Sequence, residues 1–152
     1  MTQIRFAENK DYEQVNAIMN QVQELHVMWR PDIYKACDTV LPQEMFEGMV
    51  SSRTMIVAEE EGEVRGLLAF TNRHIETPAH VTRNVLFIDS MAVDKTHRGQ
   101  GIGHQLFAFI WSLAQEKGFD GVELQVNARN HAAYEMYKKY GFTEKSINME
   151  LL

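Results

Sequence analysis

The clearest chemistry in this chain comes from a glycine-rich stretch. Between Arg98 and His104, glycines stand at every second position, as Gly99, Gly101 and Gly103. Glycine lets a backbone turn tightly, so successive main-chain amides can point at one centre. An amphipathic helix pattern follows directly, and its N-terminus adds the positive end of a helix dipole. These features predict a phosphate-binding turn. A turn that only joins a strand to a helix is the alternative.

The spacing of these glycines excludes the two familiar nucleotide-binding loops. A P-loop needs Gly-Lys-Ser/Thr at the start of the helix, whereas here Gly103 is followed by His104 and Gln105. A dinucleotide-binding fingerprint needs a third glycine at the position that His104 occupies. Both familiar nucleotide-binding motifs therefore fail on spacing.

A second group of chemically useful residues lies roughly thirty positions downstream of the glycines. It has the pattern Asn130-x-x-Ala133-x-x-x-Tyr137-x-x-x-Gly141-Phe142. Asparagine is a good helix N-cap and glycine a good helix stop, so this pattern predicts a helix from residue 130 to residue 140. The helix carries three tyrosines at three-residue spacing, of which Tyr137 is the middle one.

Together, the two patterns resemble the GNAT superfamily of acyl-CoA-dependent N-acyltransferases. Arg98-x-x-Gly101-x-Gly103 looks like the pyrophosphate loop of that family, and the downstream pattern looks like its later helix and strand. The clear match covers Val85 to Phe142. The resemblance implies an N-acetyltransferase that moves an acetyl group from acetyl-CoA to a primary amine, by direct attack in a ternary complex.

The resemblance also implies roles for individual residues. The glycine-loop amides would hold the pyrophosphate of coenzyme A, the preceding strand would pair with pantetheine, Asn130 would bind the pantetheine arm, and Tyr137 would face the thioester sulfur. The loop and strand residues so implied are Met91, Ala92, Val93, Arg98, Gly99, Gln100, Gly101, Ile102, Gly103 and His104.

Reference acidities define what Tyr137 can do. A phenol of pKa about 10 would give its proton to a thiolate of pKa about 8.5 only at a cost of about 2 kcal/mol. We therefore expect Tyr137 to act first as a hydrogen-bond donor to the developing thiolate, with late or concerted proton transfer. The alternative is a half-buried packing tyrosine, since Tyr134 and Tyr140 flank it.

The identity of the general base is less clear from the sequence. Some members of the family carry a glutamate on the strand before the tyrosine helix, and the equivalent inward position here is Gln125, which cannot titrate. Asp89, in the strand before the glycine loop, is the next candidate, and Glu123 is another. A structural carboxylate and a water chain remain as alternatives.

The acceptor pocket is expected near the end of the first helix and the connection that follows it. Candidate acceptor-binding residues there are His26, Trp29, Arg30 and Tyr34. An arginine can clamp a carboxylate and a tryptophan can stack on an acceptor, although ordinary loop packing explains the same residues. No tight metal-ligand spacing occurs among the six histidines, so no metal is expected.

Composition limits the class of protein and its partners. At 152 residues the chain fits one domain, residues 1–152, and the net charge of −6 disfavours non-specific nucleic-acid binding. No apolar run reaches the roughly 20 residues of a membrane span, and the N-terminus lacks a signal-peptide pattern. The single cysteine, Cys37, excludes an intrachain disulfide. We expect a cytoplasmic protein that binds a small-molecule or peptide amine and neither membrane nor nucleic acid.

Hydrophobic periodicity predicts the elements that must hold these groups. The order is β-α-α-β-β-β-α-β-α-β, an α/β fold with a mixed, mostly antiparallel sheet and helices on both faces. Asp11 is expected to open the first helix in a capping box with Gln14. The predicted segments are strands at 4–7, 54–60, 64–72, 85–93, 122–126 and 142–152, helices at 11–25, 42–50, 102–117 and 130–140, and a loop at 73–83.

Two other functions stay open at this level. A non-catalytic acyl-CoA sensor would keep the glycine loop but lack a base, and Gln125 is consistent with it. A protein that binds the phosphates of a nucleotide is the other alternative. The weakly patterned last strand, Ser146 to Leu152, could pair across a homodimer, and the oligomeric state is otherwise open.

Overall fold

The computed structural model describes residues 1–152 and is built on one five-stranded sheet of order β1-β2-β3-β4-β5. Neighbouring strands are antiparallel except β4 and β5, which are parallel. No helix combines the length and hydrophobicity that a membrane span requires. The elements are β1 (Gln3–Phe6), η1 (Asn9–Asp11), α1 (Tyr12–Trp29), α2 (Gln43–Ser52), β2 (Met55–Glu60), β3 (Glu63–Thr77), β4 (His80–Val93), η2 (Lys95–His97), α3 (Ile102–Glu116), β5 (Gly121–Leu124) and α4 (His131–Tyr140).

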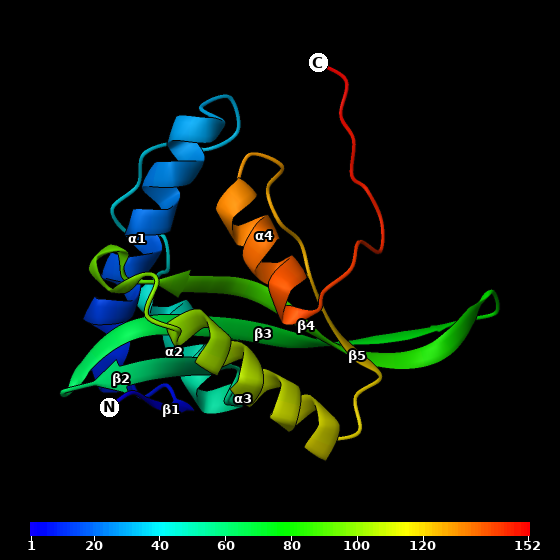
Figure 1. Ribbon diagram of the computed structural model, residues 1–152, viewed down its shortest axis with the longest axis horizontal. Coiled ribbons are helices and arrows are strands. Elements are labelled where there is room, and N and C mark those ends of the chain that lie inside the picture. The colour runs from blue at the N-terminus through cyan, green and yellow to red at the C-terminus, as the bar shows by residue number, and fades with distance from the viewer.

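Helices cover both faces of the sheet, as predicted (Figure 1). Alternate residues of β2 point to opposite faces: Val57 joins the core under α1 and α2, and Ile56 joins the core under α3. The α3 core also takes in residues of α4. The mixed, mostly antiparallel α/β architecture is confirmed.

A close approach of α3 to the sheet fixes the start of that helix. Gly66 of β3 lies beneath it, and a Cβ there would come 3.0 Å from Ile102 Cγ2 and 3.2 Å from the carbonyl oxygen of Ala92. Only glycine leaves room for this packing. The first turn of α3 is therefore held directly against β3 and β4.

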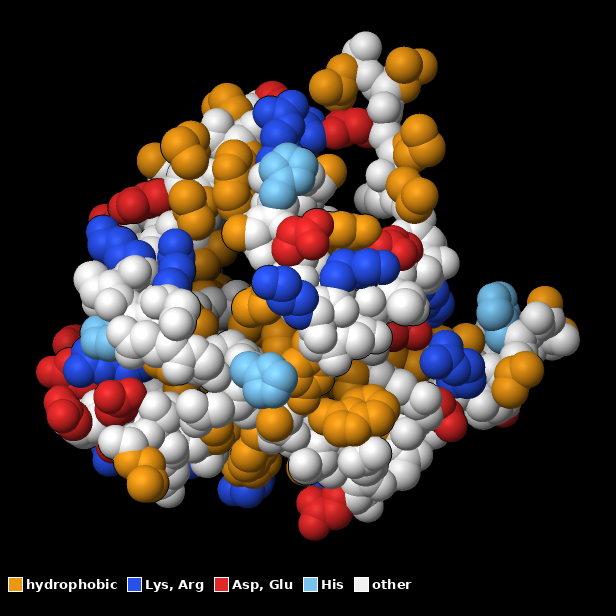
Figure 2. All heavy atoms as spheres, in the orientation of Figure 1, with side chains coloured by type: hydrophobic (Ala, Val, Ile, Leu, Met, Phe, Trp, Pro, Cys, Tyr) orange, Lys and Arg blue, Asp and Glu red, His pale blue; other side chains and the backbone are white.

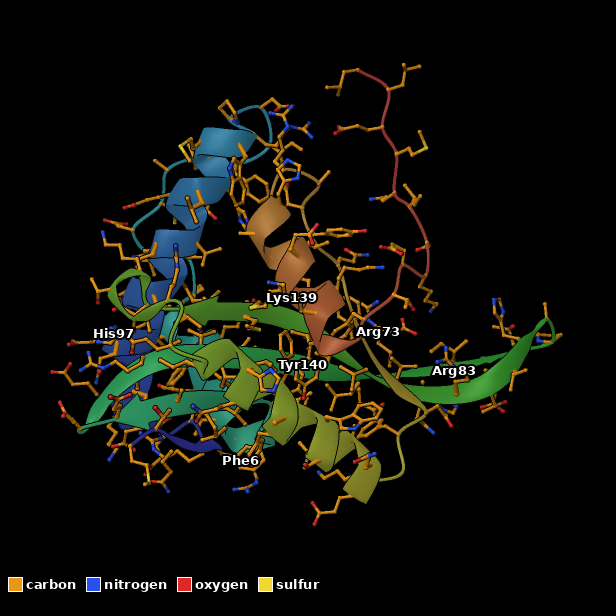
Figure 3. The ribbon with its side chains drawn as sticks, in the orientation of Figure 1. Phe6, Arg73, Arg83, His97, Lys139 and Tyr140 are labelled. Atoms are coloured by element: carbon orange, nitrogen blue, oxygen red, sulfur yellow. The ribbon has the colours of Figure 1, made fainter.

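The loop predicted at 73–83 is wrong, because β3 and β4 continue there as a projecting two-stranded ribbon (Figure 1). The two strands pair as far as Thr77 and His80, which leaves a two-residue turn at the tip. Nearly all of the ribbon is exposed, so its sequence lacks the apolar alternation of a half-buried strand. Its base is fixed by Arg73, whose guanidinium lies 3.4 Å from the centroid of the Phe87 ring (Figure 3).

The strand predicted at 142–152 is also wrong. From Thr143 to Leu152 the chain is exposed, forms no strand, and makes no backbone hydrogen bond. The predicted strand at 122–126 is shorter than expected, ending at Leu124.

The capping box predicted between Asp11 and Gln14 is not formed. Asp11 is buried and accepts two hydrogen bonds from Arg5, at 2.8 and 2.9 Å, so its carboxylate is not available to α1. Gln14 instead accepts from the main-chain N–H of Val64, at 2.7 Å. Burial acts to raise the pKa of Asp11, but the hydrogen bonds from Arg5 and from the main-chain N–H of Glu8, together with the nearby positive charges, outweigh it and the pKa is lowered.

Replacing this carboxylate tests how far the ion pair supports the fold. Asp11→Asn should lower the free energy of unfolding by about 3 kcal/mol at pH 7, because it leaves the Arg5 charge short of a buried partner. A lowered native pKa means that the Asp11 contribution is present above about pH 4 and is lost as the pH falls through the native value. In urea titrations, the difference from the unmodified protein should therefore shrink below about pH 4.

Glu8 provides the matched control, since it also pairs with Arg5, at 3.4 Å, but its side chain is 58% exposed. Glu8→Gln should change stability by less than about 1 kcal/mol. Equal effects of the two substitutions would contradict the importance of the buried pair.

Candidate active site

The glycine loop presents a continuous run of unpartnered main-chain donors. None of the seven N–H groups from Arg98 to His104 makes a hydrogen bond to backbone or side chain. Gly99 and Gly101 have φ values of +78° and +84°, and a Cβ at either position would meet no atom within 4 Å. The run ends on the first turn of α3, where the helix dipole adds positive potential. A row of free amides of this kind suits an anionic group such as a diphosphate.

A polar network anchors the base of this loop to α1. The Asp94 carboxylate accepts hydrogen bonds from Gln21 at 2.8 Å, from Thr96 at 2.5 Å and from the His97 ring at 2.7 Å. Gln21 also accepts from the main-chain N–H of Lys95, at 2.9 Å. These bonds, that of Gln21 first, hold the pKa of Asp94 far below its usual range. Gln21 was not expected from the sequence, which gives no signal for a contact across 73 positions.

The last part of β4 has one free edge. Pairing between β4 and β5 ends at Ile88 and Leu124, while β4 stays paired with β3 as far as Val93. At the point of separation, Ile88 pairs with Phe70 and Ser90 pairs with Ala69. Asp89 between them has no partner in β3 and forms a bulge. The two strands therefore part, and beyond Ile88 the edge of β4 that faced β5 is open.

The register shows which peptide groups face this opening. The N–H of Asp94 bonds to Arg65 of β3, and peptide groups alternate in direction along a strand. The N–H and C=O groups of Met91 and Val93 therefore point away from β3, into the opening, whereas those of Ala92 point to β3. The Val93 carbonyl accepts a bond from Arg98 Nε at 3.1 Å, which ties the loop to this edge.

Two methionines cover the inner side of the α3 N-terminus. A Cβ at Gly103 would lie 3.0 Å from Met91 Cε and 3.3 Å from Met136 Sδ. Both side chains are flexible and unbranched, so they can rearrange when a ligand enters. A hollow of about 410 Å³ lies alongside, between α3 and α4. Its lining includes Met136, His104 and Tyr140. The ring centroids of His104 and Tyr140 lie 4.8 Å apart, where α4 contacts α3 (Figure 3).

Tyr137 differs from Tyr134 of α4 but shares its surroundings with Tyr140, which also packs on Phe107, at 5.0 Å between ring centroids, and has a hydroxyl without a hydrogen bond. Tyr137 itself packs edge-on against Phe107, with ring centroids 5.6 Å apart, and its hydroxyl makes no hydrogen bond within the protein. Burial raises the pKa of Tyr137, so the phenol keeps its proton at neutral pH. Tyr134 instead donates its hydroxyl hydrogen to Glu144 at the surface. Tyr137 is therefore a half-buried phenol with an uncommitted donor.

The side chain of Asn130 is committed to the fold. Its Oδ1 accepts from the N–H of Ala133 at 3.1 Å and caps α4, as predicted. The amide nitrogen of Asn130 makes no hydrogen bond within the protein. Only that nitrogen is free to contact a ligand.

The two candidate bases, Asp89 and Glu123, and the non-titrating Gln125 occupy different environments. Asp89 lies in the strand before the glycine loop, as predicted, and is exposed because the bulge turns it out of the sheet. Gln125 follows the end of β5 and is exposed rather than inward-facing. Glu123 binds Lys145, at 2.9 Å, and Arg83, at 3.4 Å. Burial acts to raise the pKa of Glu123, but these cations outweigh it and lower the pKa.

The residues expected to bind an acceptor meet at the end of α1. His26 packs against Tyr34 at 4.7 Å and against Trp29 at 5.9 Å between ring centroids, and burial lowers the pKa of His26, so the imidazole is neutral at pH 7. Arg30 does not point a free guanidinium at a substrate. It binds Asp32 at 2.8 Å and also binds Glu150 of the C-terminal segment.

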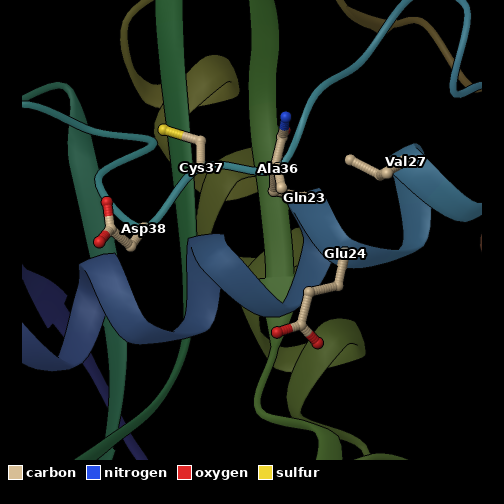
Figure 4. Close-up of a pocket in the computed structure, with 6 residues that line it drawn as sticks. All are labelled: Gln23, Glu24, Val27, Ala36, Cys37 and Asp38. Atoms are coloured by element: carbon tan, nitrogen blue, oxygen red, sulfur yellow. The ribbon is translucent and has the colours of Figure 1, made fainter.

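A hollow of about 580 Å³ lies between α1 and the segment 36–38 (Figure 4). It is lined by Gln23, Glu24, Val27, Ala36, Cys37 and Asp38. The two carboxylates give it an acidic lining, and Cys37 is an exposed free thiol.

Removing the Gln21 amide should loosen the glycine loop. In Gln21→Ala, the main-chain N–H of Lys95 loses its acceptor and Asp94 loses one donor. A lost bond of about 1 kcal/mol should speed hydrogen exchange of the Lys95 amide about fivefold or more. The control is Gln23→Ala, because Gln23 bonds to Lys35 on another side of α1. Unchanged exchange in Gln21→Ala would remove Gln21 from the loop anchor.

Comparison with known proteins places the chain in a family. Residues 19–142 match the model of the acetyltransferase (GNAT) family. An uncharacterised N-acetyltransferase of Methanocaldococcus jannaschii is 40% identical over 65 residues, which are 43% of this chain and 29% of that protein. A streptothricin acetyltransferase of Escherichia coli is 34% identical over 62 residues, which are 41% of this chain and 36% of that protein. The matches thus span about a third of these relatives.

Solved structures extend the similarity to the whole chain. A point mutant of the BH1408 protein of Bacillus halodurans superposes with a TM-score of 0.94 at 29% identity, over 99% of this chain and 98% of that one. An aminoglycoside N-acetyltransferase in complex with CoA superposes with a TM-score of 0.73 at 16% identity, over 100% and 94%, which is a likeness of fold. The family match and the fold agree with the motifs, and this chain belongs to the GNAT acetyltransferase family.

Proposed function

We propose that this protein transfers an acetyl group from acetyl-CoA to the primary amine of an acceptor, by direct attack while both substrates are bound. The observation that carries the proposal is the run of seven unpartnered N–H groups from Arg98 to His104, beside the open edge of β4. An anionic ligand with an extended amide-bearing arm matches both features at once.

The chain offers partners for each part of such a ligand. The loop amides would bind the diphosphate, and the peptide groups of Met91 and the main-chain N–H of Val93 would pair with the amides of the pantetheine arm, since the Val93 carbonyl already accepts from Arg98. Ala92 would act by keeping this strand bonded to β3, and Asn130 would contribute its free amide nitrogen. When bound, acetyl-CoA supplies an acetyl group already activated as a thioester.

Tyr137 would stabilise the leaving sulfur. Its raised pKa keeps the hydroxyl protonated, so it can donate a hydrogen bond where negative charge develops. The attacking amine must lose a proton, and Asp89 at the separation of β4 and β5 would accept it directly or through water. Holding the two reactants together contributes up to roughly 7–11 kcal/mol in favourable cases, so a weak base suffices.

The acceptor would enter along α1, at the aromatic group of His26, Trp29 and Tyr34 and at the acidic hollow between α1 and the segment 36–38. Glu24 and Asp38 there favour a cationic amine. The names of the relatives cover streptothricin and the alanine of a ribosomal protein, so both small molecules and protein amines belong in a first acceptor panel.

A second candidate function is a non-catalytic sensor of acyl-CoA. One observation favours it: neither position offers a buried carboxylate, because Asp89 is exposed and residue 125 is a glutamine. Measuring free thiol release with acetyl-CoA and the amine panel separates the two: turnover supports the transferase, and tight binding without turnover on any amine supports the sensor.

Tyr137→Phe removes the hydroxyl and keeps the ring packing. We expect kcat to fall about 100-fold, because the leaving thiolate loses its donor, while the dissociation constant for acetyl-CoA stays within about twofold. Thiol release gives kcat, and calorimetry gives the affinity. Tyr134→Phe on the same helix is the control and should leave kcat unchanged. Full turnover in Tyr137→Phe would exclude Tyr137 from the chemistry.

Gly101→Val tests the loop amides. A side chain there would obstruct ligand approach and strain a residue at φ +84°, so acetyl-CoA should bind at least about tenfold more weakly. Gly118→Val controls for backbone strain, since Gly118 has φ +73° and equally open surroundings at the far end of α3. Unchanged affinity in a folded Gly101→Val protein would contradict the loop assignment.

A further inference from the structure

The ten C-terminal residues, Thr143 to Leu152, form an exposed tail that leaves the body of the molecule (Figure 1). No main-chain group in the tail makes a hydrogen bond to another main-chain group. Four apolar side chains stand almost wholly in solvent: Ile147 is 81% exposed, Met149 88%, Leu151 99% and Leu152 95%. Exposure of this much apolar surface on one short segment is typical of an interaction site.

From Ile147 to Leu151 the apolar residues of the tail recur at every second position, and the apolar Leu152 follows directly. Ile147, Met149 and Leu151 alternate with the polar residues Asn148 and Glu150. This period of two would place the three apolar side chains on one face of a β-strand. Such a strand needs a sheet edge for its main chain and an apolar layer for that face.

The tail does not reach such an edge within its own chain. At its base, Lys145 binds Glu123 of β5 at 2.9 Å, and near its end Glu150 binds Arg30 at the close of α1. Between these two contacts the tail runs clear of the body, and Figure 2 shows open space between them. Its apolar side chains therefore stay uncovered while both contacts hold.

A matching edge is present on the same molecule. β5 is the last strand of the sheet and pairs only with β4, so its outer edge is free. Val122 and Leu124 of β5 are half-buried and pack on the α3 core. A strand added outside β5 would extend this apolar layer with every second side chain.

We infer that two copies of this chain exchange tails, with Ser146–Leu152 of each copy added as a strand to the outer edge of β5 in the other. One chain carries both the unpaired tail and the unpaired edge, so a two-fold arrangement satisfies both in both copies. This inference is independent of the proposed catalytic function, because it uses no residue of the glycine loop or of α4.

The oligomeric state of charge-bearing tail variants tests the exchange. Sedimentation should show a dimer for the unmodified protein and a dissociation constant at least about tenfold higher for Met149→Asp. Asn148→Asp adds the same charge on the opposite face of the strand and should leave the dimer intact. A monomeric unmodified protein, or equal behaviour of the two variants, would overturn the inference.

Cross-linking gives a second test that does not depend on weakening the dimer. In a Cys37→Ser background, a chain with Met149→Cys and a tagged chain with Leu124→Cys are co-expressed and oxidised. A disulfide between the two different chains is expected. When both cysteines are placed in one chain, a cross-linked monomer would show that the tail folds on its own β5 and would overturn the exchange.

Discussion

Parallel pairing between β4 and β5 stops at Ile88 and Leu124, where Asp89 forms a bulge in β4. Beyond this point β4 keeps one strand partner, β3. On its other edge the peptide groups of Met91 and the N–H of Val93 are free, while the Val93 carbonyl accepts from Arg98. The strand then leads into the glycine loop, whose amides are equally unpartnered. If β4 and β5 stayed paired, these main-chain groups of β4 would be hydrogen-bonded within the sheet. Because the strands separate, the groups are available for a ligand. The side chains of the site are arranged around this opening.

Much of the fold could be predicted because its buried elements carry strong patterns. The apolar run of residues 85–93, the stripe of α3, and the Asn130 and Gly141 boundaries of α4 were all read correctly. The sequence does not predict the projecting ribbon at 73–83, because a strand that is solvent-exposed on both faces shows no apolar alternation. The tail was read as a strand because its alternation is real, although its own chain supplies no paired edge.

The candidate site divides in the same way. Backbone features follow from local sequence, since glycines at 99 and 101 and the start of a helix determine where amides stay free. Long-range side-chain partners do not. The bond from Gln21 to Asp94 and the ion pair of Glu150 with Arg30 join segments that are far apart in the sequence. Residue spacing therefore predicts neither contact. Asp89 was placed in the right strand, but a bulge changes the direction of a side chain and is invisible in a hydrophobic pattern.

The glycine at position 66 has a consequence for how the loop meets its ligand. By letting Ile102 rest directly on β3, it fastens the first turn of α3 to the most central part of the sheet. The donors on that turn are then already oriented before anything binds, so little conformational entropy is lost on association. Affinity for a diphosphate in this protein would thus be set partly by a missing methyl group on the far side of the helix from the ligand.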